Sequence, residues 1–170
     1  MNKIKFKGND IHICGNIPSI GDKAPIFTAT NTDLSTFNLK DYIGKKNIVL
    51  NIFPSIDTNV CAASVRKFNK LAEEIKDTII ICISRDLPFA HKRFCGAEGI
   101  NNVLTVSEFR DDNFSKSYGI KIIDGPLEGL LARSVFIIDK LGIIRYVQIV
   151  EEISEEPDYD KVVEVLKQIN

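Results

Sequence analysis

Residues 48–61 of this chain read IVLNIFPSIDTNVC, an uninterrupted apolar run that leads through a polar loop to a cysteine. The apolar run, residues 48–53, has the character of a strand that is covered on both faces of a sheet. Residues 60–75 follow with apolar side chains every three or four positions, which is the spacing of an amphipathic helix. The stretch therefore predicts a strand, a loop and a helix that carries Cys61 in its first turn.

A cysteine in the first turn of a helix lies in a distinctive electrostatic environment. The backbone N–H groups there lack partners, and the end of the helix carries a partial positive charge. Both favour the thiolate over the thiol, so Cys61 is a candidate nucleophile, whereas the alternative is a small buried residue without chemistry. Pro54 shapes the entrance of the loop and favours the nucleophile. Thr58, three residues before the sulfur, is both a candidate catalytic hydroxyl and a good helix N-cap, and the two roles are compatible.

The rest of the chain continues with alternating strands and helices. Apolar runs and turn residues predict further strands at residues 27–30, 36–39, 78–84 and 103–106, and hairpins at 4–14 (with a Gly-Asn turn) and 134–150. Helical spacing predicts helices at residues 88–95, 113–118 and 158–169, with Gly96 and Gly99 stopping the first of them. Parallel strands joined by right-handed crossovers, followed by an antiparallel hairpin, give a mixed sheet between helices. We therefore expect one α/β domain, residues 1–170, with a thioredoxin-like plan and an N-terminal β-hairpin.

The composition limits the partners that we expect. The net charge of −1 implies no broad attraction to nucleic acid or to an anionic membrane. No apolar run approaches the ~20 residues that span a bilayer, and residues 1–8 lack the apolar segment of a signal peptide. We expect a cytoplasmic protein, where a pair of cysteines is more often redox-active than structural.

The motif Pro-x-x-x-Thr-x-x-Cys, occupied by Pro54, Thr58 and Cys61, resembles the peroxidatic motif of peroxiredoxins. Three longer strings in the right order resemble the bacterial thiol peroxidase subgroup, the atypical two-cysteine peroxiredoxins: PSIDTNVCAASVR from residue 54, RFC from residue 93 and GPLEGLLARSVF from residue 125. The resemblance covers nearly the whole chain. Asn59 departs from it, because proline is common there, but asparagine caps a helix equally well.

The resemblance implies a thioredoxin-dependent peroxidase without a bound cofactor or metal. Cys61 would attack hydrogen peroxide or an organic (alkyl) hydroperoxide and become a sulfenic acid, and Cys95 would resolve it as an intramolecular Cys61–Cys95 disulfide. Thr58 and Arg133 would hydrogen-bond the thiolate and the peroxide, and Pro54 would shield them from water. Thioredoxin would reduce the disulfide. The subgroup also suggests a homodimer.

Simpler interpretations exist for several of these residues. Arg133 precedes a strand, where an arginine is often a solvent-facing ion-pair partner, and Cys95 could be an ordinary packed thiol. A disulfide joins Cα atoms within about 7 Å, and we expect these two residues, on separate helices, to lie farther apart than that in the reduced fold. We therefore expect the segments around Cys61 and Cys95 to unwind when the two cysteines pair. Gly96 and Gly99 make this unwinding plausible.

The remaining thiols and both histidines carry weaker signals. Cys82 lies inside a strand of isoleucines and is expected to be an inert buried thiol, and Cys14 is expected to have no catalytic role. His12 and Cys14 could form half of a metal site, but no further ligands are evident. We expect His91 to lie on the surface of a helix, and the acidic residues 151–156 to form a solvated loop.

Two other functions remain open at this point. A disulfide oxidoreductase of the thioredoxin type normally uses Cys-x-x-Cys, which this chain lacks. A redox sensor or binding module could use the same cysteines as a peroxidase, and it would differ by consuming about one equivalent of peroxide rather than many.

Overall fold

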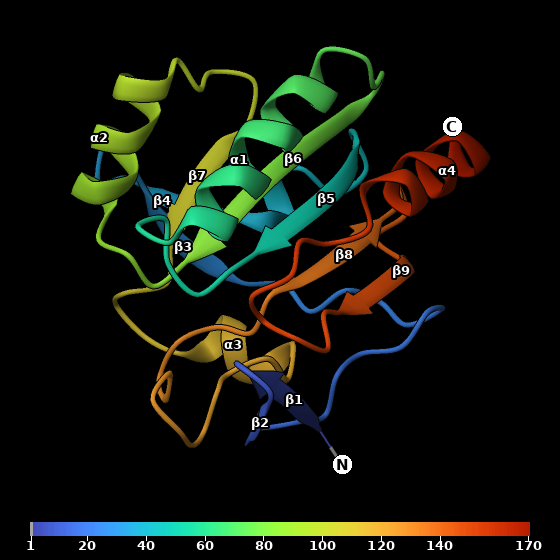
Figure 1. Cartoon of the computed structure of the whole chain (residues 1–170). Coiled ribbons are helices and arrows are strands. Elements are labelled where there is room, and N and C mark those ends of the chain that lie inside the picture. Colours follow the sequence, from blue (N-terminus) through green and yellow to red (C-terminus); the bar gives the residue numbers. More distant parts are fainter. Residues whose placement is uncertain (1) are drawn as a thin grey trace.

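The apolar run at residues 48–53 forms the buried strand β5 (Asn47–Ile52), in which every residue is buried. The structure, a computed structural model, describes residues 2–170 (Figure 1). Within that range, β5 belongs to a seven-stranded sheet with the strand order β4-β3-β7-β6-β5-β8-β9. Strands β5, β6 and β7 run parallel to one another, and β8 pairs antiparallel to β5. The predicted mixed sheet is therefore confirmed.

The bounds of the elements follow the predicted order along the chain. The other strands are β1 (Lys3–Phe6), β2 (Asn9–His12), β3 (Thr28–Asn31), β4 (Thr36–Asn38), β6 (Thr78–Ser84), β7 (Leu104–Ser107), β8 (Ser134–Ile138) and β9 (Ile144–Ile149). The helices are α1 (Asn59–Ala72), α2 (Pro88–Glu98), α3 (Asn113–Ser117) and α4 (Tyr159–Ile169). A turn of 3-10 helix covers Leu39–Asp41. The parallel strands and the helices between them give the thioredoxin-like α/β plan expected from the sequence.

The two faces of the sheet carry separate apolar layers. Successive side chains of a strand point to opposite faces, so alternate residues of β5 enter different layers. Val49 packs with α1 and α4 in one layer, together with the apolar side of α2. Ile48 and Leu50 pack in the other layer with α3 and the hairpin β1–β2. Figure 1 shows the hairpin beside α3, apart from the three longer helices. Cys61 belongs to the first of these layers.

Two predicted boundaries were wrong. The hairpin turns at Lys7 and Gly8 rather than at Gly-Asn, because both residues have positive φ (50° and 81°), and Asn9 belongs to β2. Helix α2 does not stop at Cys95 but runs through Gly96 to Glu98. It ends at Gly99, whose left-handed backbone (φ 66°) suits a glycine at a helix C-terminus.

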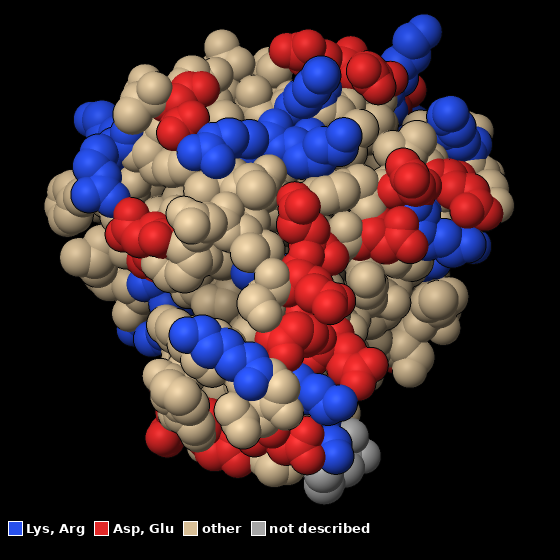
Figure 2. Space-filling model, in the orientation of Figure 1, with Lys and Arg blue, Asp and Glu red and all other residues tan. Residues whose placement is uncertain are grey.

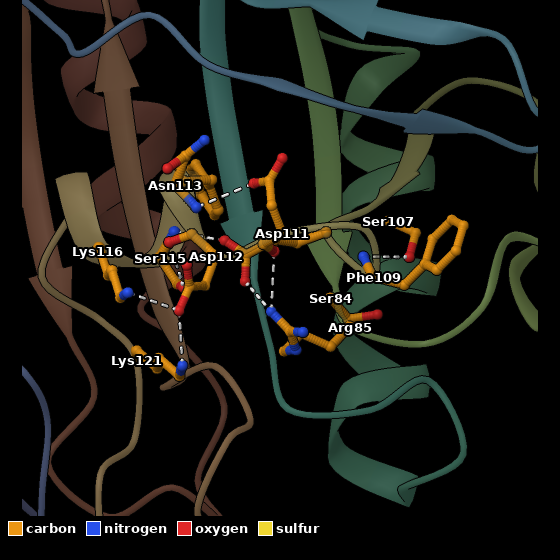
Figure 3. A network of polar contacts seen from close by, with 12 residues as sticks. Ser84, Arg85, Ser107, Phe109, Asp111, Asp112, Asn113, Ser115, Lys116 and Lys121 are labelled. Carbon is orange, nitrogen blue, oxygen red and sulfur yellow. Dashed lines mark hydrogen bonds and ion pairs between the residues drawn. The ribbon is translucent and has the colours of Figure 1, made fainter.

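Polar side chains fix the segment that follows β7 (Figure 3). The buried carboxylate of Glu108 pairs with Arg85 Nη1 at 2.7 Å, and the same nitrogen donates to the Asp111 carbonyl at 3.1 Å. Asp112 binds Lys116 and Lys121, each at 2.9 Å, and these two lysines lower the pKa of its carboxyl to about 2. Helix α3 is only five residues long, and these contacts hold it at the end of the sheet.

Acidic side chains form a band on one face of the molecule, where the segment between β9 and α4 passes (Figures 1 and 2). Most of the acidic residues at 151–156 are exposed, as expected. Glu152, however, is half-buried and accepts hydrogen bonds from the backbone N–H groups of Lys7 and Gly8 at 3.1 and 3.0 Å. Over residues 2–170, no helix is both long and apolar enough to cross a bilayer.

Candidate active site

The strand register brings three chain segments to one edge of the sheet. Ile52, near the end of β5, pairs with Ile83 of β6 on one side and with Ser134 of β8 on the other. The loop that leads to Cys61 leaves from this end of β5. Arg133, next to Ser134, therefore lies opposite that loop, and the segment after β6 lies beside it. Open α/β sheets commonly place their chemistry at such strand ends.

Cys61 is fully buried and lies in the first turn of α1, as predicted. Thr58 is the N-cap: its Oγ1 accepts a hydrogen bond from the Cys61 backbone N–H at 3.4 Å. The Thr58 hydroxyl donates its own hydrogen to the Ser55 carbonyl at 3.1 Å. The capping role of Thr58 is thus confirmed, and its hydroxyl hydrogen is directed away from Cys61 Sγ in this structure.

Arg133 is buried, with 2% of its surface exposed, and it contacts the cysteine directly. Its Nη2 donates to Cys61 Sγ at 3.3 Å, and its Nε donates to the Ile153 carbonyl at 2.8 Å. Its third nitrogen, Nη1, is buried without a hydrogen-bond partner among the described residues. The alternative of a solvent-facing ion pair was wrong. The guanidinium is held by one hydrogen bond to a carbonyl and donates another to the sulfur, so its Nη1 is left to donate to a further acceptor.

The N-terminal hairpin supports the position of Arg133 through the segment at 151–153. Lys5 donates its backbone N–H to the Glu151 carbonyl at 2.7 Å and accepts from Ile153 N at 2.9 Å. The carbonyl of the same Ile153 then accepts the hydrogen bond from Arg133 Nε. The hairpin therefore holds in place the backbone group that orients the guanidinium, a role that the sequence did not indicate.

A cavity of about 180 Å³ opens beside the Cys61 helix end. Most of its surface is apolar, and Pro54, Thr58 and Arg133 lie in its wall, so the structure brings together four of the five candidate site residues. The other lining residues are Phe6, Ser55, Asn59, Val60, Leu127, Leu130, Ile153 and Ser154. A small apolar molecule with one polar end would fit this cavity with its polar end toward Arg133.

Cys95, the fifth candidate, lies apart from this cavity. It is half-buried on α2, its Sγ is 3.7 Å from Thr105 Oγ1, and burial raises the pKa of its thiol. It lines a different cavity of about 350 Å³, between α2 and β7. Cys95 and Cys61 are both free cysteines here, and within residues 2–170 no hydrogen bond joins them.

The other two thiols differ from Cys61 in their surroundings. Cys82 is fully buried in β6, and burial raises the pKa of its thiol to about 12 although Asn51 Nδ2 donates to it at 3.6 Å. This agrees with the expectation of an inert thiol. Cys14 is exposed, and its Sγ lies 3.7 Å from the Ser115 carbonyl.

The histidines do not form a metal site in the part of the chain that the structure covers, where no group of three or more suitable ligands occurs. His12 Nδ1 instead pairs with Asp124 Oδ2 at 2.6 Å. The prediction that His91 lies on the surface was wrong, because only 1% of it is exposed. His91 follows the apolar Pro88 at helical spacing and precedes Cys95 by four residues, so it faces the sheet.

Asp86 is a further polar residue at this edge that the sequence analysis missed. It follows β6 by two residues, and its Oδ2 accepts the Ile56 backbone N–H at 2.7 Å while Oδ1 accepts from Ser55 Oγ at 2.8 Å. A carboxylate directly after a buried parallel strand was the signal that could have located it.

Comparisons with known proteins point in one direction. Residues 19–163 match the family described as Redoxin. A thiol peroxidase of Corynebacterium glutamicum is 52% identical over 160 residues, which is 94% of this chain and 96% of that protein. A thiol peroxidase of Leptospira interrogans is 53% identical over 161 residues, 94% of each chain.

Solved structures share the fold over the full length. A peroxiredoxin-like protein from Aquifex aeolicus superposes with a TM-score of 0.93 at 39% identity, covering 100% of this chain and 98% of its own. A thiol peroxidase from Chromobacterium violaceum gives a TM-score of 0.91 at 19% identity, covering 99% and 97%. The second likeness concerns the fold alone.

Proposed function

This chain belongs to the redoxin family, as a thiol peroxidase of the peroxiredoxin type, and we propose that it reduces hydrogen peroxide and alkyl hydroperoxides through Cys61. The observation that carries this proposal is the buried contact of 3.3 Å between Arg133 Nη2 and Cys61 Sγ. A buried positive charge beside a sulfur at a helix N-terminus stabilises the thiolate, which is the nucleophilic form.

In the first step, Cys61 thiolate attacks the terminal oxygen of the hydroperoxide. The S–O bond forms as the O–O bond breaks, the sulfur is oxidised to a sulfenic acid, and the leaving oxygen takes a proton and departs as water or an alcohol. Negative charge moves from the sulfur to the leaving oxygen. The unpaired Arg133 Nη1 supports this step, since it is a donor next to the sulfur that can bind a peroxide oxygen.

Thr58 and Pro54 act around this centre. Thr58 caps the helix through Oγ1, and a rotation of its hydroxyl from the Ser55 carbonyl would direct the hydrogen at the bound peroxide or thiolate. Pro54 and the apolar wall of the cavity limit the access of water, which strengthens the charge-assisted hydrogen bonds of Arg133. The same apolar wall supports alkyl hydroperoxides as substrates beside hydrogen peroxide.

In the second step, Cys95 resolves the sulfenic acid. Its thiolate attacks the oxidised sulfur, the Cys61–Cys95 disulfide forms, and the hydroxide leaves as water after taking a proton. The two cysteines belong to separate helices, and Cys95 lines a cavity that does not include Cys61, so the start of α1 and the end of α2 must unwind locally. Thioredoxin or a similar dithiol donor then reduces the disulfide by exchange and returns both thiols.

Peroxide consumption with a thioredoxin recycling system tests this function. Wild type should turn over many times, Cys61→Ser should not react, and Cys95→Ser should stop after one equivalent. Cys14→Ser is the matched control, because Cys14 is exposed and far along the chain from either reacting thiol, and it should behave as wild type. No wild-type turnover with any dithiol donor would remove the peroxidase and leave a redox sensor.

The proposal includes a homodimer in the cytoplasm. A thioredoxin-dependent cycle and four free cysteines suit a reducing compartment. Sedimentation at micromolar concentration should give a species of twice the 19.1 kDa chain mass, and a monomer alone would contradict the dimer.

A further inference from the structure

A buried polar cluster between β6 and α2 has no part in the chemistry described so far. It consists of Ser84 at the end of β6, Asp86 and His91 on α2. His91 Nε2 lies 2.8 Å from Ser84 Oγ and 3.7 Å from Asp86 Oδ2. Ser84 and His91 are each no more than 1% exposed, and the Asp86 side chain is 11% exposed. Three polar side chains at such burial need a structural or functional reason.

The hydrogen bonds of the cluster have one consistent direction. Ser84 has a single hydroxyl hydrogen, which it donates to Asp86 Oδ2. The Ser84 oxygen must therefore accept from His91, so His91 carries a hydrogen on Nε2. His91 thus donates to Ser84, and Ser84 donates to the Asp86 carboxylate. These two hydrogen bonds connect α2 to that carboxylate.

The same Asp86 carboxylate also holds the loop before Cys61. It accepts the Ile56 backbone N–H and the Ser55 hydroxyl. The carbonyl of Ser55 in turn accepts from Thr58 at both the backbone N–H (3.2 Å) and Oγ1 (3.1 Å). Ser55 therefore links the Asp86 carboxylate, through hydrogen bonds, to Thr58, the N-cap of the helix that carries Cys61.

We propose that Asp86, held by Ser84 and His91, is a positioning residue that fastens the Cys61 loop to helix α2, favouring oxidation of Cys61 and slowing its resolution by Cys95. This proposal rests on the proposed peroxidase cycle. Oxidation needs the folded loop with Thr58 in place, whereas resolution needs the start of α1 and the segment around Cys95 to leave this folded arrangement and unwind. The hydrogen bonds to one carboxylate stabilise the first arrangement and oppose the second.

The charge of Asp86 fits this role. Burial opposes its ionisation, but the His91 ring 3.7 Å away and the hydrogen bonds from Ser84, Ile56 and Ser55 outweigh burial and lower the pKa to about 2. The carboxylate is thus a full acceptor at neutral pH, and charged acceptors form the stronger hydrogen bonds. An ion pair between the same two segments, Arg93 Nη2 to Asp57 Oδ1 at 2.8 Å, is exposed and is expected to contribute little.

The test measures the two half-reactions separately in Asp86→Asn. Oxidation of Cys61 is followed by single-turnover peroxide consumption in a Cys95→Ser background, and disulfide formation by quenched mass spectrometry with Cys95 present. We expect oxidation to slow about tenfold and disulfide formation to quicken about tenfold, because one acceptor of a charged hydrogen-bond set is lost. Rates that both fall, or that both stay within about twofold, would overturn the proposal.

Asp124→Asn is the matched control, since Asp124 also accepts a backbone N–H (2.7 Å) and a histidine nitrogen (2.6 Å), both from His12. It should leave both rates within about twofold, and an equal effect would show that Asp86→Asn acts only through general destabilisation. His91→Gln keeps a donor toward Ser84 and should retain both rates. His91→Leu removes that donor and should slow oxidation of Cys61 and quicken disulfide formation, each by less than Asp86→Asn does. If Asp86→Asn does not fold, His91→Leu decides.

Hydrogen exchange separates the failure of this proposal from the failure of the peroxidase cycle. In Asp86→Asn the amides of residues 55–61 should exchange about tenfold faster than in wild type, with those of β6 unchanged. This readout needs no peroxide. If the wild type is inactive but Asp86→Asn shows this faster exchange, the peroxidase cycle is refuted and the fastening role stands. If the wild type is active but Asp86→Asn does not show it, the fastening role is refuted and the cycle stands.

Discussion

Cys61 and Cys82 lie in the same apolar layer, and neither exposes any surface, yet they differ in what each sulfur contacts. Cys61 sits at the start of a helix with a guanidinium nitrogen 3.3 Å from its sulfur. Cys82 sits inside a strand, where its sulfur accepts a hydrogen bond from the Asn51 amide. Burial without a charged partner raises the pKa of the Cys82 thiol to about 12. Burial therefore leaves a thiol inert unless the fold brings a positive charge to it.

The largest expected effect is a difference in alkylation between the two thiols. At pH 7 and with short exposure to iodoacetamide, Cys61 should be modified faster than Cys82 by a factor on the order of 10³, because only the thiolate reacts and burial raises the pKa of the Cys82 thiol to about 12. Peptide mass mapping of native and urea-unfolded samples measures the ratio. Equal modification of both thiols in the native protein would show that the guanidinium beside Cys61 does not distinguish the two sulfurs.

Removal of the positive charge should bring Cys61 closer to Cys82 in behaviour. Arg133→Met keeps an apolar side chain of similar length, and it should slow oxidation of Cys61 by about 10²- to 10³-fold, the usual cost of one positioned donor. Single-turnover peroxide consumption measures the rate. Arg145→Met is the control. Arg145 pairs with Asp139, which follows the opposite end of β8 from Arg133, so its loss should not affect the rate. Unchanged oxidation in Arg133→Met would refute the role of the guanidinium.

Acid should loosen the Cys61 region before it loosens the strand of Cys82. The pKa of Asp86 is lowered to about 2 in the folded state, against about 3.9 when unfolded, so its contribution is complete above pH 4. That contribution is lost as the pH falls from about 4 to 2, and it amounts to at most about 2 kcal/mol after screening. Urea unfolding of wild type and Asp86→Asn should show a stability difference that shrinks across this range. A difference independent of pH would contradict the assignment.

The smallest expected effect comes from changing Cys82 itself. Cys82→Ala removes one buried sulfur and should lower the free energy of unfolding by about 1 kcal/mol without changing peroxide turnover. Urea denaturation and the recycling assay measure the two quantities. Loss of turnover at unchanged stability would show that the second thiol takes part in the chemistry.

The sequence contained the local part of the site. The apolar run of β5, the N-cap at Thr58 and the position of Cys61 in the first helical turn all depend on neighbouring residues, and all were predictable. The order of strands and helices gave the mixed sheet for the same reason. The wrong boundaries were at glycines: Gly96 continues a helix, whereas Gly99 ends one.

The long-range part of the site needed the structure. Arg133 could be expected near Cys61 from the family resemblance, but its anchor on the Ile153 carbonyl depends on the pairing of β8 and on the N-terminal hairpin. His91 was misplaced because one polar residue in a short helix carries little periodicity. Asp86 acts through bonds to residues 30 and 31 positions away, which no local pattern encodes.

The contact between Lys5 and residues 151–153 also bears on the order in which the parts of this region come together in a newly made chain. Strand β1 is synthesised early, but its partner segment leaves the ribosome only after β9. Until then the carbonyl that orients the guanidinium is absent, although Cys61 and its helix have long been made. A nascent chain can therefore build much of the sheet while the Ile153 carbonyl that orients the Arg133 guanidinium is still missing.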